Sequence, residues 1–139
     1  MKISKSISIL AILIAGLTIP TMQSCKKYPE GPSISLQSRT ERVTNTWRVD
    51  NYKINGNDHT SAMSDYSETY SENGDYTYSW GMFSGTGVWK FENDDKEIKL
   101  IGTSNQNNYL MTILKLEEKE FWYYYMDGDD KKEFHMIQK

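Results

Sequence analysis

The sequence predicts an all-β protein: an antiparallel up-and-down barrel of about eight short strands with a short N-terminal helix or turn. Three observations support this prediction. All 18 aromatic residues (10 Tyr, 4 Trp and 4 Phe) follow residue 25, and aromatic side chains favour strands. From residue 47 onward, short stretches of alternating apolar and polar residues are separated by turn residues. About eight such stretches follow one another, and a meander of that length can close into a barrel.

The first 24 residues have the layout of a cleaved secretion signal. Lys2 and Lys5 provide a positive start, and residues 7–19 form an uncharged, mostly apolar run of 13 residues. This run is too short for a transmembrane helix, which needs about 20 apolar residues. The only cysteine of the chain, Cys25, stands where such a signal is cut.

The end of this signal, at Ser24 and Cys25, resembles a bacterial lipobox. The resemblance implies that the Cys25 thiol takes a diacylglyceryl group, that the chain is cut before it, and that the new amine is acylated, for example with palmitate. Ordinary secretion is the alternative, but it needs small residues at the first and third positions before the cut, and no such pair stands near residues 20–26. By resemblance, Lys26 after the cysteine implies the outer membrane, at its periplasmic face or on the cell surface.

The predicted mature chain, from Cys25 to Lys139, has 115 residues, enough for one domain. We expect a lipidated cysteine and a flexible tether over residues 25–40, which include two prolines, and a barrel domain over residues 41–139. The signal holds two of the 16 basic residues and no acid, which leaves 14 basic and 19 acidic residues and a net charge of −5. This acidity argues against nucleic-acid binding, which calls for a basic face.

The opening strand of the barrel shows a change of parity. Trp47 and Val49 alternate on one side, whereas Tyr52 and Ile54 alternate on the other. An unbroken strand cannot bury both pairs on one face, so we predict a β-bulge near residues 50–51.

Residues 66–80 form the clearest hairpin. A two-residue turn at Asn73-Gly74 would split the tyrosines between the two faces of the hairpin. A three-residue loop over residues 72–74, with Gly74 in the left-handed conformation, instead pairs Tyr70 with Tyr76. We expect this second register, because it gathers the aromatic residues on one face: Tyr66, Tyr70, Tyr76, Tyr78 and Trp80.

The later strands follow the same alternation. After a turn over residues 81–85, Trp89 is expected opposite Leu100. For the strand over residues 109–117 we expect one inward set: Leu110, Thr112, Leu114 and Leu116. A tight turn at residues 118–119 then places Leu116 opposite Phe121 and Leu114 opposite Tyr123.

Several of these segments resemble the small lipocalin-like lipoproteins of Gram-negative bacteria: the signal with Cys25 and residues 45–49, 72–74, 85–91, 113–116 and 133–136. Trp47 resembles the tryptophan that plugs one end of a lipocalin barrel. The resemblance implies a lipocalin-like barrel with a calyx that holds a small hydrophobic ligand without catalysis.

The candidate ligand-binding residues are inward aromatic side chains and one acid: Trp47, Tyr66, Glu68, Tyr70, Tyr78, Trp80, Trp89 and Tyr123. An eight-stranded barrel is either filled by side chains or holds one small ligand, and so many rings leave both interpretations open. Glu68 is expected on the aromatic face, opposite Tyr78. It forms either the polar end of a ligand site or a hydrogen-bonded, hydrated group near the rim.

No pattern in the sequence indicates catalysis, a cofactor or a metal site. His59 and His135 lack metal-ligand spacing, and no nucleophile elbow or phosphate loop is present. Residues 127–130 lack the spacing of a calcium loop and are expected to form a hairpin turn. We therefore expect a non-enzymatic ligand-binding lipoprotein. The alternative is an adaptor whose exposed aromatic side chains, Trp122 and Tyr124, bind an envelope protein or a glycan.

Overall fold

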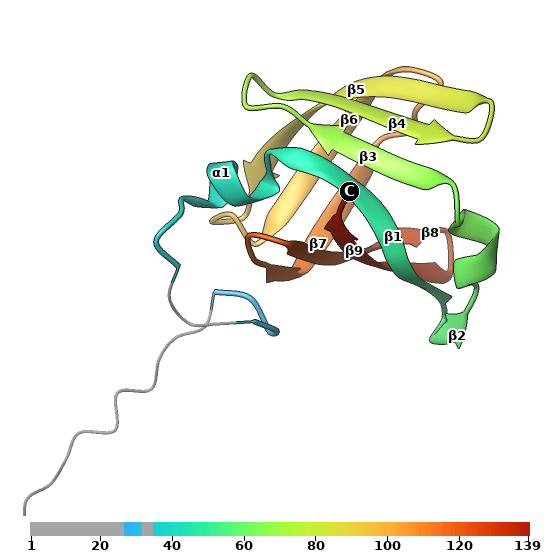
Figure 1. Cartoon of the computed structure of the whole chain (residues 1–139), viewed down its shortest axis with the longest axis horizontal. Helices are drawn as coiled ribbons and strands as arrows, with labels where there is room; N and C mark the ends of the chain where they lie inside the picture. Colours follow the sequence, from blue (N-terminus) through green and yellow to red (C-terminus); the bar gives the residue numbers. More distant parts are fainter. Residues whose placement is uncertain (1–26, 32–34) are drawn as a thin grey trace, which may run out of the picture.

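The computed structural model describes residues 27–31 and 35–139, and these residues form the predicted antiparallel barrel (Figure 1). Its strands are β1 (Asn45–Ile54), β3 (Tyr66–Tyr70), β4 (Asp75–Trp80), β5 (Phe83–Glu92), β6 (Glu97–Ser104), β7 (Tyr109–Leu116), β8 (Glu120–Asp127) and β9 (Asp130–Gln138). They follow one another around the barrel in chain order, and pairing of β1 with β9 closes it. The predicted signal, residues 1–24, and Cys25 lie outside the described residues.

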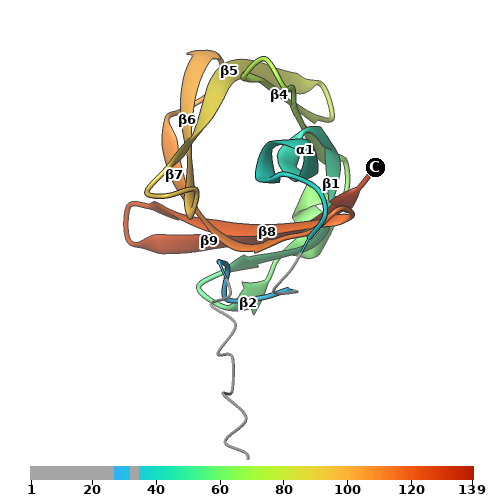
Figure 2. The same ribbon diagram turned by 90° about the vertical axis from the view of Figure 1, so that its left-hand side faces the viewer.

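Three short elements lie at the two ends of the barrel. Helix α1 (Arg39–Val43) precedes β1, and it lies within the ring of strands when the barrel is viewed from that end (Figure 2). At the opposite end, β2 (Asn57–Asp58) extends the pairing of β1, and the 3-10 helix η1 (Thr60–Met63) leads into β3. We call the part of the barrel next to α1 the closed half and the part next to η1 the open half.

The closed half is filled by side chains. A capping box starts α1, because the Ser38 hydroxyl accepts a bond from the Glu41 N–H while the Glu41 carboxylate accepts one from the Ser38 N–H. Val43, the last residue of the helix, and Trp47 beneath it are fully buried, and the Trp47 indole donates to the Val43 carbonyl at 3.0 Å. The Trp47 ring packs against Phe121 at a centroid distance of 5.7 Å. Trp47 therefore plugs this end, as its resemblance implies.

Two register predictions are confirmed. The pairing of β1 with β9 shifts between Val49 and Asn51, so both Val49 and Tyr52 are buried. In the first hairpin Tyr70 lies opposite Tyr76, with Gly74 at a φ of 93°. The turn predicted over residues 81–85 is too long, since β5 already begins at Phe83.

Strand β7 differs from the prediction. The predicted inward set was Leu110, Thr112, Leu114 and Leu116. Met111 and Ile113 are buried instead, and Leu110 is 50% exposed. Leu116 does face inward, opposite Phe121 as predicted.

A second bulge explains this difference. The register of β7 on β8 shifts between Ile113 and Lys115, so Ile113 lies opposite Tyr123, the position predicted for Leu114. One extra residue changes the parity of a strand, which lets both Ile113 and Leu116 face inward. The Leu114 carbonyl, at the bulge, accepts a hydrogen bond from the Glu30 N–H at 2.8 Å.

Of the chain before α1, residues 27–31 contact the barrel, whereas residues 35–38 are exposed. Tyr28 is 6% exposed, and its hydroxyl donates to the Asp95 carbonyl at 3.0 Å. Lys27 forms an ion pair with Asp94 at 3.1 Å, and Arg39 forms one with Asp95. This part of the segment expected as a flexible tether is therefore held to the turn between β5 and β6 and to the β7 bulge.

Candidate ligand-binding site

The middle of the barrel contains a buried carboxylate. Alternate residues of a strand face the same side, so β3 turns Tyr66, Glu68 and Tyr70 inward. Glu68 lies opposite Tyr78 of β4, as predicted, and it is only 3% exposed. The interpretation that placed Glu68 near the rim is wrong, because its carboxylate is buried in the middle of the barrel among tyrosine side chains.

Four tyrosine hydroxyls donate hydrogen bonds to this carboxylate. Its Oε1 atom accepts bonds from Tyr66 at 2.7 Å, Tyr123 at 2.8 Å and Tyr76 at 3.0 Å. Its Oε2 atom accepts one from Tyr70 at 3.0 Å. We call Tyr66, Tyr70, Tyr76 and Tyr123 the tyrosine cage. Its members come from β3, β4 and β8, so the cage ties distant strands to one carboxylate.

When Glu68 is ionised, hydrogen bonds from these hydroxyls stabilise its charge. No basic side chain in the described ranges lies within ion-pair distance of it. Burial raises the pKa of Glu68, and the four hydrogen bonds oppose this rise without cancelling it. Burial and the nearby carboxylate raise the pKa values of Tyr66, Tyr70 and Tyr123 well above the usual range. The cage tyrosines therefore remain protonated donors.

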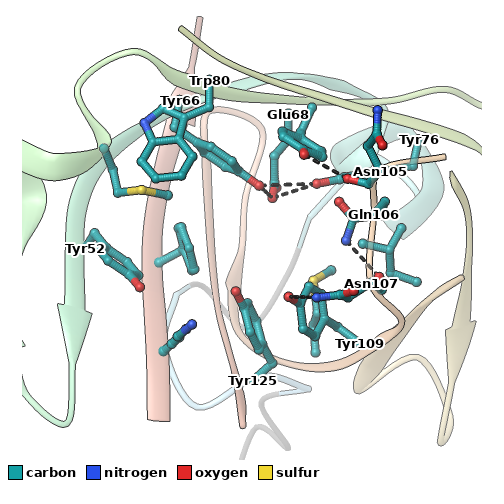
Figure 3. Close-up of a pocket in the computed structure, with 16 residues that line it drawn as sticks. Tyr52, Tyr66, Glu68, Tyr76, Trp80, Asn105, Gln106, Asn107, Tyr109 and Tyr125 are labelled. Atoms are coloured by element: carbon teal, nitrogen blue, oxygen red, sulfur yellow. Dashed lines mark hydrogen bonds between the residues drawn. The ribbon is translucent and has the colours of Figure 1, made fainter. Parts of the chain in front are cut away.

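A cavity of about 280 Å³ occupies the open half, above this carboxylate (Figure 3). Tyr66, Glu68 and Tyr76 line it from the cage side, and we call them the floor. Six further aromatic residues line it, and we call them the aromatic wall: Tyr52, Tyr78, Trp80, Tyr109, Tyr125 and Phe134. Within the wall, Tyr109 and Tyr125 stack at a centroid distance of 4.1 Å. The site combines large aromatic surfaces with a polar floor.

The mouth of the cavity is formed by residues 105–107 and Lys132. The Asn105 carbonyl accepts a hydrogen bond from the Tyr78 hydroxyl at 2.8 Å, which joins this loop to the wall. Lys132 forms an ion pair with Asp127 on the neighbouring strand. Its charge is thus balanced at the rim.

Two glycines allow the mouth to take this shape. A Cβ atom on Gly102 would lie 1.7 Å from the Gln106 carbonyl oxygen, so only glycine lets the loop approach β6. A Cβ atom on Gly85 would lie 2.3 Å from the Tyr78 ring. Both contacts place residues that line the cavity.

The structure divides the eight predicted ligand-binding residues between the two halves. Tyr66, Glu68, Tyr78 and Trp80 line the cavity. Tyr70 and Tyr123 are fully buried and reach the site only through their bonds to Glu68. Trp47 and Trp89 belong to the hydrophobic core and do not line the cavity. A cavity and a packed core, the two open interpretations, therefore occur in different parts of one barrel.

Several cavity residues are absent from the predicted set. Tyr125 shares its parity with Phe121 and Tyr123, and this signal was sufficient to place it inward. Tyr52 follows from the predicted bulge in β1. The loop over residues 105–107 carries no pattern that indicates its position over the barrel.

Within the described ranges, no group of three or more His, Cys, Asp and Glu residues is placed to hold a metal ion. His135 stacks on Trp122 on the outside of the barrel at a centroid distance of 4.0 Å. Residues 127–130 form the turn between β8 and β9, as predicted. Among the helices described, none is long and apolar enough to cross a membrane.

The barrel is similar to a solved structure described as a DUF4847 family protein from Bacteroides vulgatus. The match has a TM-score of 0.50 and 11% sequence identity, and it covers 70% of this chain and 94% of the other. At this identity the similarity concerns the fold alone. No family model matches the sequence, and no curated protein matches it.

Proposed function

We propose that the protein binds one small, largely apolar molecule in the cavity of the open half, without catalysis. The cavity itself is the observation that carries this proposal. Ligand pockets are concave and mostly apolar, with a few convergent polar groups, and they measure about 300–1,000 Å³. At about 280 Å³, with an aromatic wall and a polar floor, this cavity suits a ligand at the small end of that range.

A mouth-blocking variant tests this role, with the apolar fluorescent dye N-phenyl-1-naphthylamine as the probe. Gln106 lines the mouth, so Gln106→Trp is expected to weaken dye binding at least about tenfold by filling the entrance. Gln138→Trp is the matched control, because Gln138 is exposed at the end of β9 beside the closed half. Equal dye binding by the two variants would show that the dye does not enter the cavity.

We also propose that the protein is a lipoprotein, anchored to the outer membrane through Cys25. The lipobox-like end of the signal and the absence of any other cysteine support this proposal. Cys25→Ser removes the sulfur that accepts the diacylglyceryl group. The variant is expected to keep its signal and to lack the lipid, both of which a mass measurement detects, and to be lost from the outer-membrane fraction. Unchanged mass and unchanged sedimentation with membranes would refute the anchor.

The adaptor role finds little support at the residues on which it was based. Trp122 lies beneath Lys115, whose ammonium is 4.4 Å from the ring centre, and Tyr124 lies beneath Lys131 at 4.3 Å. Both rings are only partly exposed. They do not form the flat, open aromatic patch that docking of a partner calls for.

A further inference from the structure

The floor of the cavity offers hydrogen-bond acceptors but no donors. A tyrosine hydroxyl has one hydrogen and two lone pairs. In the floor, the Tyr66 and Tyr76 hydroxyls lie 2.7 Å and 3.0 Å from Glu68 and 3.3 Å from each other, so both hydrogens are taken up inside the cage. Only their lone pairs are left for a ligand.

The hydroxyl hydrogens of Tyr66 and Tyr76 are not available to a ligand because Glu68 accepts hydrogen bonds from the cage. An ionised carboxylate has no hydrogen of its own and accepts all four cage bonds. Hydrogen bonds from neutral phenols spread its negative charge but leave the net charge in place. With Glu68 ionised, the floor is therefore an anionic site, and no basic side chain of the described ranges lies within ion-pair distance of it.

The aromatic wall favours the same sign of ligand charge. The face of an aromatic ring attracts a cation, most strongly for Trp and Tyr, and the wall consists of four tyrosines, one tryptophan and one phenylalanine. Among the described residues that line the cavity, Lys132 is the only basic one. It is already paired with Asp127. An anionic ligand would meet no donor at the floor and no free positive charge at the mouth.

We propose that the cavity selects small ligands that carry a protonated amine. The ammonium group donates hydrogen bonds to the floor, and the apolar remainder of the ligand packs against the aromatic wall. This inference rests on the proposed ligand-binding function and adds the chemical class of the ligand. Neutral molecules bind more weakly, and carboxylates or phosphates are rejected.

Three ligands of similar size that differ in the head group test the selection: phenethylamine, 2-phenylethanol and 3-phenylpropionate. Isothermal titration at about pH 8, where an alkyl amine is still protonated, measures each affinity. Because hydrogen bonds to charged groups are the stronger ones, the amine is expected to bind at least about tenfold more tightly than the alcohol. The carboxylate is expected to bind most weakly. Equal affinities, a reversed order or no binding of the amine would overturn the inference.

Variants of floor residues test whether the Glu68 carboxylate and the Tyr66 hydroxyl cause the preference for an amine. Glu68→Gln keeps the shape of the side chain but removes the charge, and Tyr66→Phe keeps the ring but removes one acceptor. Each is expected to reduce the preference for amine over alcohol at least about fivefold. Tyr124→Phe, on the outer face of β8, is the matched control and leaves the ratio unchanged.

Thermal unfolding checks that each variant is folded. If Glu68→Gln does not fold, Tyr66→Phe and the head-group series on the unaltered protein still decide the question. The dye experiment separates the two proposals. Dye binding inside the cavity without any head-group preference refutes the amine selectivity alone, whereas failure of the dye to enter the cavity refutes the proposed function.

Discussion

The closed half and the open half are built from the same strands and the same kinds of side chain, yet one is packed and the other is hollow. In the closed half, Trp47, Phe121 and Ile98 are completely buried. In the open half, Tyr66, Tyr109 and Tyr125 are only partly buried and surround a cavity of about 280 Å³. Aromatic content alone therefore does not decide whether a small barrel is filled.

The difference between the halves arises at the ends of the barrel. Helix α1 inserts Val43 into the closed half, above Trp47, and removes the space there. At the other end, η1 contributes only Met63 to the cavity lining, and the loop over residues 105–107 stays at the rim. The Glu68 cage marks the boundary, because the closed half supplies Tyr70 and Tyr123 while the open half supplies Tyr66.

The largest expected effect comes from removing one tryptophan from each half. Trp47→Ala should lower the free energy of unfolding by about 3–5 kcal/mol, because it leaves a void in a packed core. Trp80 is 42% exposed at the edge of the cavity, so Trp80→Ala should cost less than about 1.5 kcal/mol. Denaturant unfolding of the two variants measures both values. Similar costs would mean that the two halves are packed alike.

The contribution of Glu68, at the boundary between the halves, to the free energy of unfolding should depend on pH. The folded protein holds the Glu68 proton more tightly than the unfolded chain does, because burial raises its pKa above the ordinary value of 4.5. The stabilisation from this group is therefore complete below about pH 4.5 and is lost as the pH rises through the folded pKa, at about 1.4 kcal/mol for each unit of difference. The surrounding cage tyrosines do not titrate in this range, since their own pKa values are raised.

A comparison of the unaltered protein with Glu68→Gln isolates this contribution from those of surface acids. The unfolding free energies of both proteins are measured from pH 4 to pH 8. As the pH rises, the unaltered protein should lose stability relative to the glutamine variant. A constant difference would show that Glu68 has the same pKa in the folded and unfolded states.

Where one face of a strand carries all the large residues, the sequence was enough to predict the register. The hairpin over residues 66–80 is such a case, because only one register gathers its rings. The bulge in β1 is another, since two apolar pairs of opposite parity cannot share a face otherwise. In each of these two segments, only one register places all the large side chains on one face.

The sequence was not enough where both parities are apolar. In β7, Leu110 and Leu114 alternate with Met111 and Ile113, so alternation does not show which set faces inward or where a bulge lies. The burial of Glu68 could not be predicted from the sequence for a different reason. Its face follows from the register, but its burial also depends on Tyr123 of β8, which is 55 residues away in the sequence.

At the mouth, the expected effect is smaller. Gly102→Ala would place a methyl group 1.7 Å from the Gln106 carbonyl oxygen. Relief of this clash requires the loop to move outward, at a cost of about 1–3 kcal/mol. The variant should unfold at a lower temperature and should bind the dye with altered affinity. A change in stability without any change in dye binding would show that the loop does not shape the entrance.

The smallest expected effect tests whether the two halves are independent. Ser38→Ala removes the hydroxyl that caps α1, and loss of such a cap costs about 1 kcal/mol. Because α1 covers only the closed half, dye affinity in the open half should remain within about twofold, as substitutions at distant sites without shared partners usually act separately. Denaturant unfolding and dye titration of the same sample measure both quantities. A loss of dye affinity in proportion to the loss of stability would indicate that the helix holds the cavity open, and the Glu68 cage would then transmit the effect from one half to the other instead of separating them.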